Sequence, residues 1–264
     1  MVALGIDVGS TNTKAVVVAV DADGGVHEAV VRRAPTPSDV PELLQVVQDL
    51  AADAVLAARL PIAAVGIASM AETGAPLDAD GRALTPLLTW QGAATDEDDA
   101  LVALLDGTDR FAATGVPATP KPPLVAIARL RRLDPALAAR MRRWAGVADL
   151  VALALTGRLA TDPTLALRTG AYRLPPAGST LARGYDPALL APFGLGPDLL
   201  PEVAHPLAPG GAVQPAAARR TGLAVGTPVS VARPVRRAAA GCTAPPGASA
   251  VSYTHLTLPT ILRV

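Results

Sequence analysis

Three short apolar runs, separated by turn residues, occupy the beginning of the chain. They span residues 3–8, 14–20 and 26–33 and are rich in valine and alanine. Residues 9–13 and 21–25 lie between them and are rich in glycine and small polar residues. Apolar runs bounded by such residues are typical of strands joined by hairpin turns. The pattern therefore predicts a β-meander at the N-terminus.

The next segment changes to helical spacing. Between residues 41 and 60 the apolar side chains recur every three or four positions, with Asp39 placed to cap the helix and Pro41 in its first turn. Residues 62–68 then form another short apolar run. The expected order, β-β-β-α-β, resembles the opening of the ribonuclease-H-like fold of actin-like ATPases. We therefore predict an α/β domain with a mixed sheet and flanking helices.

The same patterns predict one more strand and four more helices further along the chain. The strand covers residues 87–90, and the helices cover residues 96–105, 122–132, 135–143 and 148–155. No internal repeat is visible.

The composition is that of a globular protein. Of 264 residues, 50% are hydrophobic and 17% are charged, and the formal net charge is zero. A neutral chain offers no electrostatic surface for nucleic acid or for an anionic membrane, and its apolar runs are too short to span a bilayer. The N-terminus has no basic leader, and a lone cysteine, Cys242, excludes an internal disulfide framework. We therefore expect a cytoplasmic enzyme or part of one.

The first turn carries the strongest candidate chemistry. An apolar strand ends in Asp7, turns at Gly9 and returns with Lys14. Glycine allows close approach to a phosphate, successive turn N–H groups can point at an anion, and an aspartate can hold Mg²⁺ through water. An ordinary β-turn is the alternative, but the complete string favours phosphate binding. The predicted cofactor-binding residues are Asp7, Gly9, Ser10, Thr11, Asn12, Thr13 and Lys14, with Asp7 also the predicted metal ligand.

This string resembles the first phosphate motif of the FGGY carbohydrate kinases, which include xylulokinase, gluconokinase and glycerol kinase. Three later parts of the chain are similar to other motifs of that family: residues 66–81, residues 155–170, and residues 199–203 together with 226–229. The matches together run from residue 3 to about residue 231. The chain therefore resembles the N-terminal domain of an FGGY kinase, and only that domain.

The resemblance implies phosphoryl transfer from ATP, with Mg²⁺, to a hydroxyl of a carbohydrate or polyol. In this family the sugar lies deep in a cleft between two domains, and an aspartate acts as base on the attacking hydroxyl. Glu72 stands where glycerol kinases carry a substrate-binding glutamate, and Met70 and Trp90 would line the sugar pocket. Alternatively, Glu72 is a solvated carboxylate in a loop, and Trp90 is an ordinary residue of the hydrophobic core. Asp162 and Arg168 would either close the pocket or pair with each other.

The chain departs from the family pattern at two places. Gly92 stands where the family carries an aspartate that contacts polyol hydroxyls, so the sugar is not specified. Val235 stands where the catalytic aspartate is expected, so no catalytic residue is intact, and the family's second domain with the adenosine site does not follow. We therefore expect the chain to be inactive alone, although its family is one of enzymes.

The character of the sequence changes near residue 233. No acidic residue follows Glu202, and residues 233–264 have neither a helical nor a strand period. The last stretch resembles translated sequencing-adaptor sequence. We therefore expect a kinase domain over residues 1–232, followed by an aberrant, disordered tail that replaces the C-terminal domain after the reading frame is lost.

Two other functions fit the same residues. The chain could be a non-catalytic protein that binds a sugar or a nucleotide, or it could be one half of a two-chain kinase. A different enzyme on the actin-like fold is disfavoured by the loop around Glu72 and by residues 161–170. The sequence specifies neither the sugar nor the oligomeric state.

Overall fold

A computed structural model of the chain describes most of its length. The described residues are 1–21, 25–89, 96–176, 178–204, 209–230 and 233–234. Their strands are β1 (Val2–Val8), β2 (Asn12–Val20), β3 (Val26–Pro35), β4 (Ala64–Ser69), β5 (Gly74–Leu77), β6 (Arg143–Gly146), β7 (Ala160–Thr161), β8 (Glu202–Val203), β9 (Pro209–Ala212), β10 (Pro228–Ser230) and β11 (Arg233–Pro234). Their helices are α1 (Val40–Ala58), α2 (Asp96–Ala103), α3 (Thr108–Thr114), α4 (Pro123–Leu133), α5 (Pro135–Arg140), α6 (Val147–Thr156), α7 (Pro163–Arg168), α8 (Pro187–Leu190), η1 (Ala191–Phe193), η2 (Pro197–Leu199) and α9 (Pro215–Thr221).

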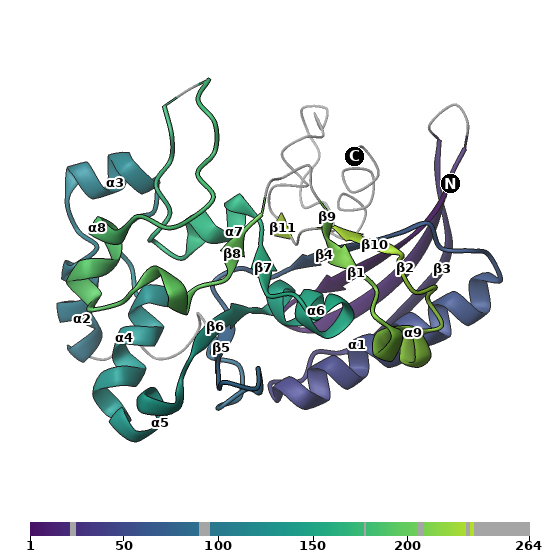
Figure 1. Ribbon diagram of the computed structural model, residues 1–264, viewed down its shortest axis with the longest axis horizontal. Helices are drawn as coiled ribbons and strands as arrows, with labels where there is room; N and C mark the ends of the chain where they lie inside the picture. Colours follow the sequence, from purple (N-terminus) through teal and green to yellow (C-terminus); the bar gives the residue numbers. More distant parts are fainter. Residues whose placement is uncertain (22–24, 90–95, 177, 205–208, 231–232, 235–264) are drawn as a thin grey trace.

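A mixed sheet forms one end of the molecule, and short helices gather at the other end (Figure 1). The strand order in the sheet is β3-β2-β1-β4-β10-β9, with β11 also paired to β4. The first three strands are antiparallel, whereas β1, β4 and β10 run parallel. Both the β-β-β-α-β order and the mixed sheet are therefore as the sequence predicts.

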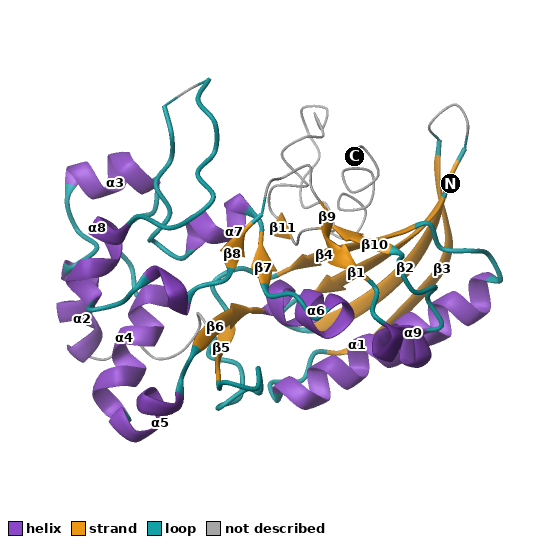
Figure 2. Cartoon of the chain, viewed as in Figure 1, coloured by secondary structure: helices purple, strands orange, loops and turns teal. Residues whose placement is uncertain are grey.

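The sheet buries one face against helices because its strands alternate. Leu4, Ile6 and Val8 of β1 join the main core with residues of α1, α6 and α9, whereas Ala3 packs with Val16 on the opposite face. Successive side chains of a strand point to opposite faces, so this division follows directly from the sequence pattern. Figure 2 shows α1, α6 and α9 together beside the sheet.

The helix α1 begins where its capping residue predicts. The Asp39 carboxylate accepts a hydrogen bond from the N–H of Glu42 at 3.0 Å, and a proline occupies the first turn. Such a cap stabilises a helix by about 1 kcal/mol. Leu43, Val47 and Ala51 lie on its buried face, which packs onto the sheet.

A second core holds the helical end together. It joins Leu124 and Ile127 of α4 to the aromatic rings of Trp144, Tyr172 and Tyr185, all of them buried. Trp144 lies in β6, which pairs with β5 and thereby links this end to the sheet. The β5–β6 pair thus joins the two cores.

Two predicted elements differ from the structure. The helix expected over residues 135–143 ends at Arg140, because Arg143 begins β6 and pairs with Leu77 of β5. In the described part of the strand expected over residues 87–90, only an isolated bridge joins Leu88 to Gly74. In such short runs, helical spacing is hard to distinguish from strand spacing. In both segments, backbone pairing with β5 determines the observed structure.

The closest backbone approach in the β5–β6 pair predicts a sensitive glycine. A Cβ atom on Gly74 would lie 2.3 Å from the carbonyl oxygen of Ala145. We expect Gly74→Ala to lower the free energy of unfolding by about 1–3 kcal/mol, since backbone cannot move aside cheaply. Gly184→Ala is the matched control, because its Cβ would meet nothing within 4 Å. Urea unfolding measures the free energy of unfolding of both variants. Equal stability of the two variants would contradict the close packing of Gly74 against Ala145.

Candidate functional site

Two candidate loops leave the sheet side by side. β1 and β4 are parallel neighbours, and their register pairs Val8 with Ser69 at their carboxyl ends. The N–H of Met70 donates to the carbonyl oxygen of Val8 at 2.9 Å. The turn after β1 and the loop around Glu72 after β4 therefore start from the same edge. Ligands of α/β sheets bind at this edge, outside the carboxyl ends of the strands.

The turn between β1 and β2 is held tightly. The N–H of Gly9 donates to the carbonyl oxygen of Asn12 at 3.0 Å, and a Cβ atom on Gly9 would lie 3.1 Å from that oxygen. The Thr36 hydroxyl donates to the carbonyl oxygen of Gly9, and the Thr13 hydroxyl lies 2.9 Å from Thr36 Oγ1. Thr13 is fully buried, so its hydroxyl serves the hairpin itself.

Other residues of this turn face outward. Ser10, Thr11 and Asn12 are exposed at its tip. Asp7 and Lys14 are register partners on the two strands. One carboxylate oxygen of Asp7 is buried without a hydrogen-bond partner. Burial raises the pKa of Asp7, and the charge of Lys14 opposes that effect.

An orphaned carboxylate oxygen beside the candidate phosphate turn suits a hydrated cation. Magnesium prefers oxygen ligands, keeps several waters and needs only one or two carboxylates. Among the described residues, no group of three or more His, Cys, Asp or Glu side chains could form a fuller metal cage. The residues present thus fit Mg²⁺ held mainly by Asp7, water and phosphate.

The loop after β4 holds a strained and paired carboxylate. Glu72 has a backbone φ of 65°, in the left-handed region, which costs a non-glycine residue about 1–2 kcal/mol. Its side chain is only 10% exposed and accepts a hydrogen bond from Arg168 in an ion pair. The adjacent Thr73 carbonyl oxygen accepts from the N–H of Val147 at 3.1 Å. Such strain persists only where neighbours hold it, and it is typical of functional sites.

The partner of Glu72 comes from the last turn of α7. The Asp162 carboxylate caps this helix by accepting from the N–H groups of Thr164 and Leu165. Arg168 then lies one and a half helical turns further on, and its side chain is 36% exposed. Asp162 therefore acts as a helix cap, and Arg168 pairs with Glu72.

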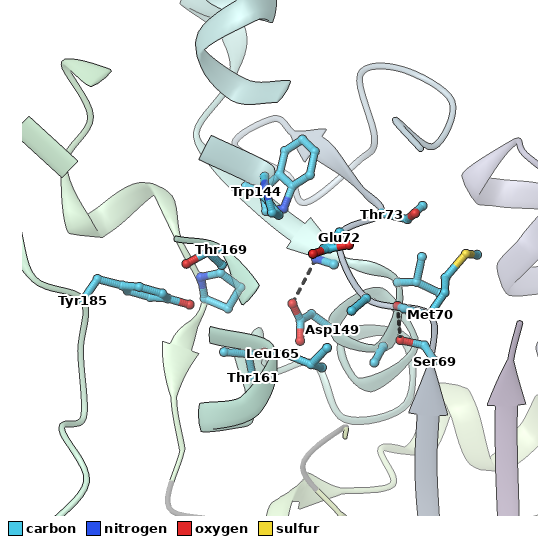
Figure 3. Close-up of a pocket in the computed structure, with 16 residues that line it drawn as sticks. Ser69, Met70, Glu72, Thr73, Trp144, Asp149, Thr161, Leu165, Thr169 and Tyr185 are labelled. Carbon is cyan, nitrogen blue, oxygen red and sulfur yellow. Dashed lines mark hydrogen bonds between the residues drawn. The ribbon is translucent and has the colours of Figure 1, made fainter. Parts of the chain in front are cut away.

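A small buried cavity lies beneath this loop (Figure 3). Met70 and Glu72 line it from one side, and Asp149, Thr161 and Tyr185 line it from α6, β7 and the segment before α8. Burial raises the pKa of Asp149 to about 7, although the Thr161 hydroxyl and the N–H of Gly146 favour its ionised form. A buried carboxyl group, that of Asp149, thus lies beneath the loop.

Not every predicted residue can be placed. Trp90 and Val235 lie outside the described residues, as does the part of the predicted tail from residue 235 onward. The first two residues of that tail, Arg233 and Pro234, form β11 and pair with β4. Met70 is partly buried, packs against the main core and lines the cavity. Asp149 is not among the residues predicted from the sequence, although an acidic residue in the first turn of a helix often accepts a hydrogen bond from the N–H at the helix start, as Asp149 does from Gly146. Tyr185 is not among them either, and the local sequence carries no signal for it.

A family model for the N-terminal domain of the FGGY family of carbohydrate kinases matches residues 2–240. The chain belongs to this family. An L-fuculokinase of Salmonella typhi is 28% identical over 250 residues, which are 86% of this chain and 49% of that protein. Membership of the FGGY family is thus as the sequence predicts.

Solved structures confirm the ribonuclease-H-like fold. Xylulose kinase from Rhodospirillum rubrum matches with a TM-score of 0.82 and 24% identity over 93% of this chain and 52% of its own. Gluconate kinase from Lactobacillus acidophilus matches with a TM-score of 0.75 and 23% identity over 88% of this chain and 48% of its own. The chain therefore spans about half the length of the FGGY kinases that it matches.

Within the described ranges, no helix is both long enough and apolar enough to cross a membrane. The cytoplasmic localisation and the absence of nucleic-acid partners stay predictions.

The raised pKa of Asp149 predicts a pH dependence of stability. The unfolded chain releases this proton near pH 3.8 and the folded chain near pH 7, so the folded state binds more protons between these values. Stability should therefore fall as pH rises through this window, by up to about 1.4 kcal/mol per pH unit. Asp149→Asn should remove this slope in urea unfolding between pH 5 and 7.

Asp99→Asn is the control for this experiment. It makes the same chemical change at an exposed position of α2. Parallel stability curves for the parent chain and Asp149→Asn would show that Asp149 titrates as an ordinary carboxyl.

Proposed function

We propose that the chain is the N-terminal half of an ATP-dependent sugar or polyol kinase and that it does not turn over alone. The observation that carries this is the ion pair of Glu72 with Arg168, beside a phosphate turn on the adjacent strand. Membership of the FGGY family indicates the reaction class, phosphoryl transfer to a carbohydrate. Two loops of this chain would bind the two reactants.

The polyol subsite is the loop after β4. Arg168 occupies one carboxylate oxygen of Glu72 and keeps this carboxylate in place. The carboxylate can still accept a hydrogen bond from a hydroxyl of a neutral sugar, since a carboxylate oxygen accepts more than one hydrogen bond. Met70, and Trp90 as predicted from the sequence, would add apolar contact.

The phosphate subsite is the turn after β1. When bound, ATP and Mg²⁺ supply the phosphoryl group and neutralise its charge. Ser10, Thr11 and Asn12 are exposed at the turn. Their N–H groups and the hydroxyls of Ser10 and Thr11 would bind phosphate oxygens, and Asp7 would hold the ion through water. Lys14 would add positive charge on the return strand. Gly9 and Thr13 would shape the turn.

The step that this chain is not expected to perform is proton removal from the sugar. A carboxylate base within hydrogen-bond reach of the attacking hydroxyl is needed for that step, and Val235 stands at the position predicted for it. A second chain that supplies a base and an adenosine site would restore turnover. A non-catalytic sugar-binding protein is the other alternative.

Polyol binding should depend on the paired carboxylate. The ligands to test are L-fuculose, D-xylulose, gluconate and glycerol. We expect Glu72→Gln to weaken binding of whichever of them binds the parent chain by about tenfold. A charge-assisted hydrogen bond is worth about 1.5–3 kcal/mol. Calorimetry measures the affinity. Asp53→Asn is the matched control, because Asp53 also pairs with an arginine but lies at the exposed side of α1.

Unchanged affinity in Glu72→Gln would contradict the polyol subsite. Unchanged affinity in Asp53→Asn, with a tenfold loss in Glu72→Gln, would support it.

The chain alone should not phosphorylate these compounds. A coupled assay with ATP and Mg²⁺ should give no sugar-dependent turnover above the rate without protein. Turnover by the purified 264-residue chain would show that a base is present and that the assignment of Val235 is wrong.

A further inference from the structure

One partly buried arginine holds three segments of the helical end together. Arg110 lies in α3, and its Nη2 atom donates to the carbonyl oxygens of Gly170 and Leu189, each at 2.9 Å. Gly170 follows α7, whereas Leu189 belongs to α8. Figure 1 shows α3 and α8 at the helical end of the molecule and α7 nearer to the sheet. A single guanidinium therefore joins α3 and α8 to the end of α7.

The surroundings of Arg110 suit a planar, charged side chain. Its Cζ atom lies 5.5 Å from the centre of the Phe193 ring, within the range of a cation–π contact. Burial lowers the pKa of Arg110, and the negative charge of Asp186 opposes this effect. An arginine stays charged in proteins even so. The guanidinium is therefore a charged donor held in one orientation rather than a solvated surface group.

One of the two carbonyl groups that Arg110 holds lies two residues beyond Arg168. It belongs to Gly170, which has a φ of 84°, the left-handed conformation that ends many helices. The N–H of Gly170 donates to the carbonyl oxygen of Leu167 at 3.1 Å, so Gly170 is joined directly to the last turn of α7. The side chain of Arg168 reaches Glu72 from that same turn. The position of Gly170 therefore affects where Arg168 lies.

Other hydrogen bonds at the end of α7 restrain it less. The N–H of Leu124 in α4 donates to the carbonyl oxygen of Thr169 at 3.4 Å, a long and therefore weak hydrogen bond. The Thr169 hydroxyl donates to the carbonyl oxygen of Ala166 within α7 itself. A hydrogen bond from a charged donor is stronger than one between neutral groups. Within the part of the chain that the structure describes, Arg110 thus provides the strongest hydrogen bond from another element to residues 169–170.

We propose that Arg110 is a positioning residue of the polyol subsite, because it holds the end of α7 from which Arg168 pairs with Glu72. Its effect on polyol binding rests on the proposed function, whereas its effect on the ion pair does not. Glu72 has a left-handed backbone and depends on its neighbours for that conformation. When Gly170 is released, the end of α7 can shift and Arg168 can leave the carboxylate. Arg110 acts on the polyol only through α7.

Loss of the guanidinium should weaken polyol binding and leave phosphate binding intact. We expect Arg110→Met to lower the affinity for the polyol that binds the parent chain by about threefold, since Arg110 acts through other residues. The affinity for Mg²⁺–ATP should not change, because the turn after β1 is held by its own hairpin and Thr36. Calorimetry measures both affinities. Arg142→Met is the matched control, because Arg142 also donates to a carbonyl oxygen, that of Ala139, but only three residues away in sequence.

A double-mutant cycle distinguishes positioning from a general loss of stability. Arg110→Met should add little to the loss of polyol affinity in Glu72→Gln, since both changes act on the same ion pair. Additive losses would overturn the proposal, as would an unchanged polyol affinity in Arg110→Met or an equal loss of Mg²⁺–ATP affinity. Arg110→Lys keeps the charge but not the planar group, so it should show a smaller loss of the same kind. It replaces Arg110→Met in the cycle if that variant does not fold.

A measurement without any polyol tests the positioning itself. In the chain with ¹⁵N-labelled arginine, the Nε–H signal of Arg168 is assigned by its absence in Arg168→Lys. We expect this proton to exchange with water faster in Arg110→Met than in the parent chain or in Arg142→Met, because the ion pair no longer restrains the side chain. An unchanged exchange rate would overturn the proposal even if the polyol binds as proposed. Faster exchange in a chain that binds no polyol would support the positioning role and contradict the polyol subsite instead.

Discussion

The parallel pairing of β1 with β4 determines where the two candidate subsites lie. The register that joins Val8 to Ser69 brings the candidate phosphate turn and the Glu72 loop to one edge of the sheet. The two loops are some sixty residues apart in sequence, and no local property would bring them together. The alternating apolar side chains of both strands fix this register, since a shift by one residue would move Leu4, Ile6 and Ile67 out of the core.

The loop after β4 then depends on its supports from outside the sheet. Glu72 is strained, and Arg168 from α7 and the start of α6 hold it in place. The pairing of β5 with β6 fixes α6 relative to β4, and the cap by Asp162 fixes the start of α7. The candidate polyol subsite is thus a product of the whole domain, whereas the phosphate turn is built from a single hairpin and Thr36.

This difference explains how much could be predicted from the sequence. The hairpin is local: strand alternation, a glycine and a run of hydroxyl residues suffice to identify it. The three predicted N-terminal strands and α1 agree closely with the structure. The pairing of Glu72 with Arg168 spans 96 residues of sequence and depends on how α7 packs. The sequence alone therefore did not determine whether Arg168 closes the pocket or pairs with Asp162. Asp149 carried a capping signal, but its burial beneath the loop is a tertiary property. The short elements β5 and β6 were not predicted because four-residue runs have too little periodicity.

The central claim is that the two loops form adjacent subsites, one for a polyol and one for phosphate. Amide chemical-shift mapping of the ¹⁵N-labelled chain tests it most directly, with the polyol and Mg²⁺–ATP titrated separately. The account predicts that the polyol shifts the amides of residues 69–74 and 168–170, and that Mg²⁺–ATP shifts those of residues 9–14. Shifts confined to other parts of the molecule, or both ligands acting on the same loop, would contradict it.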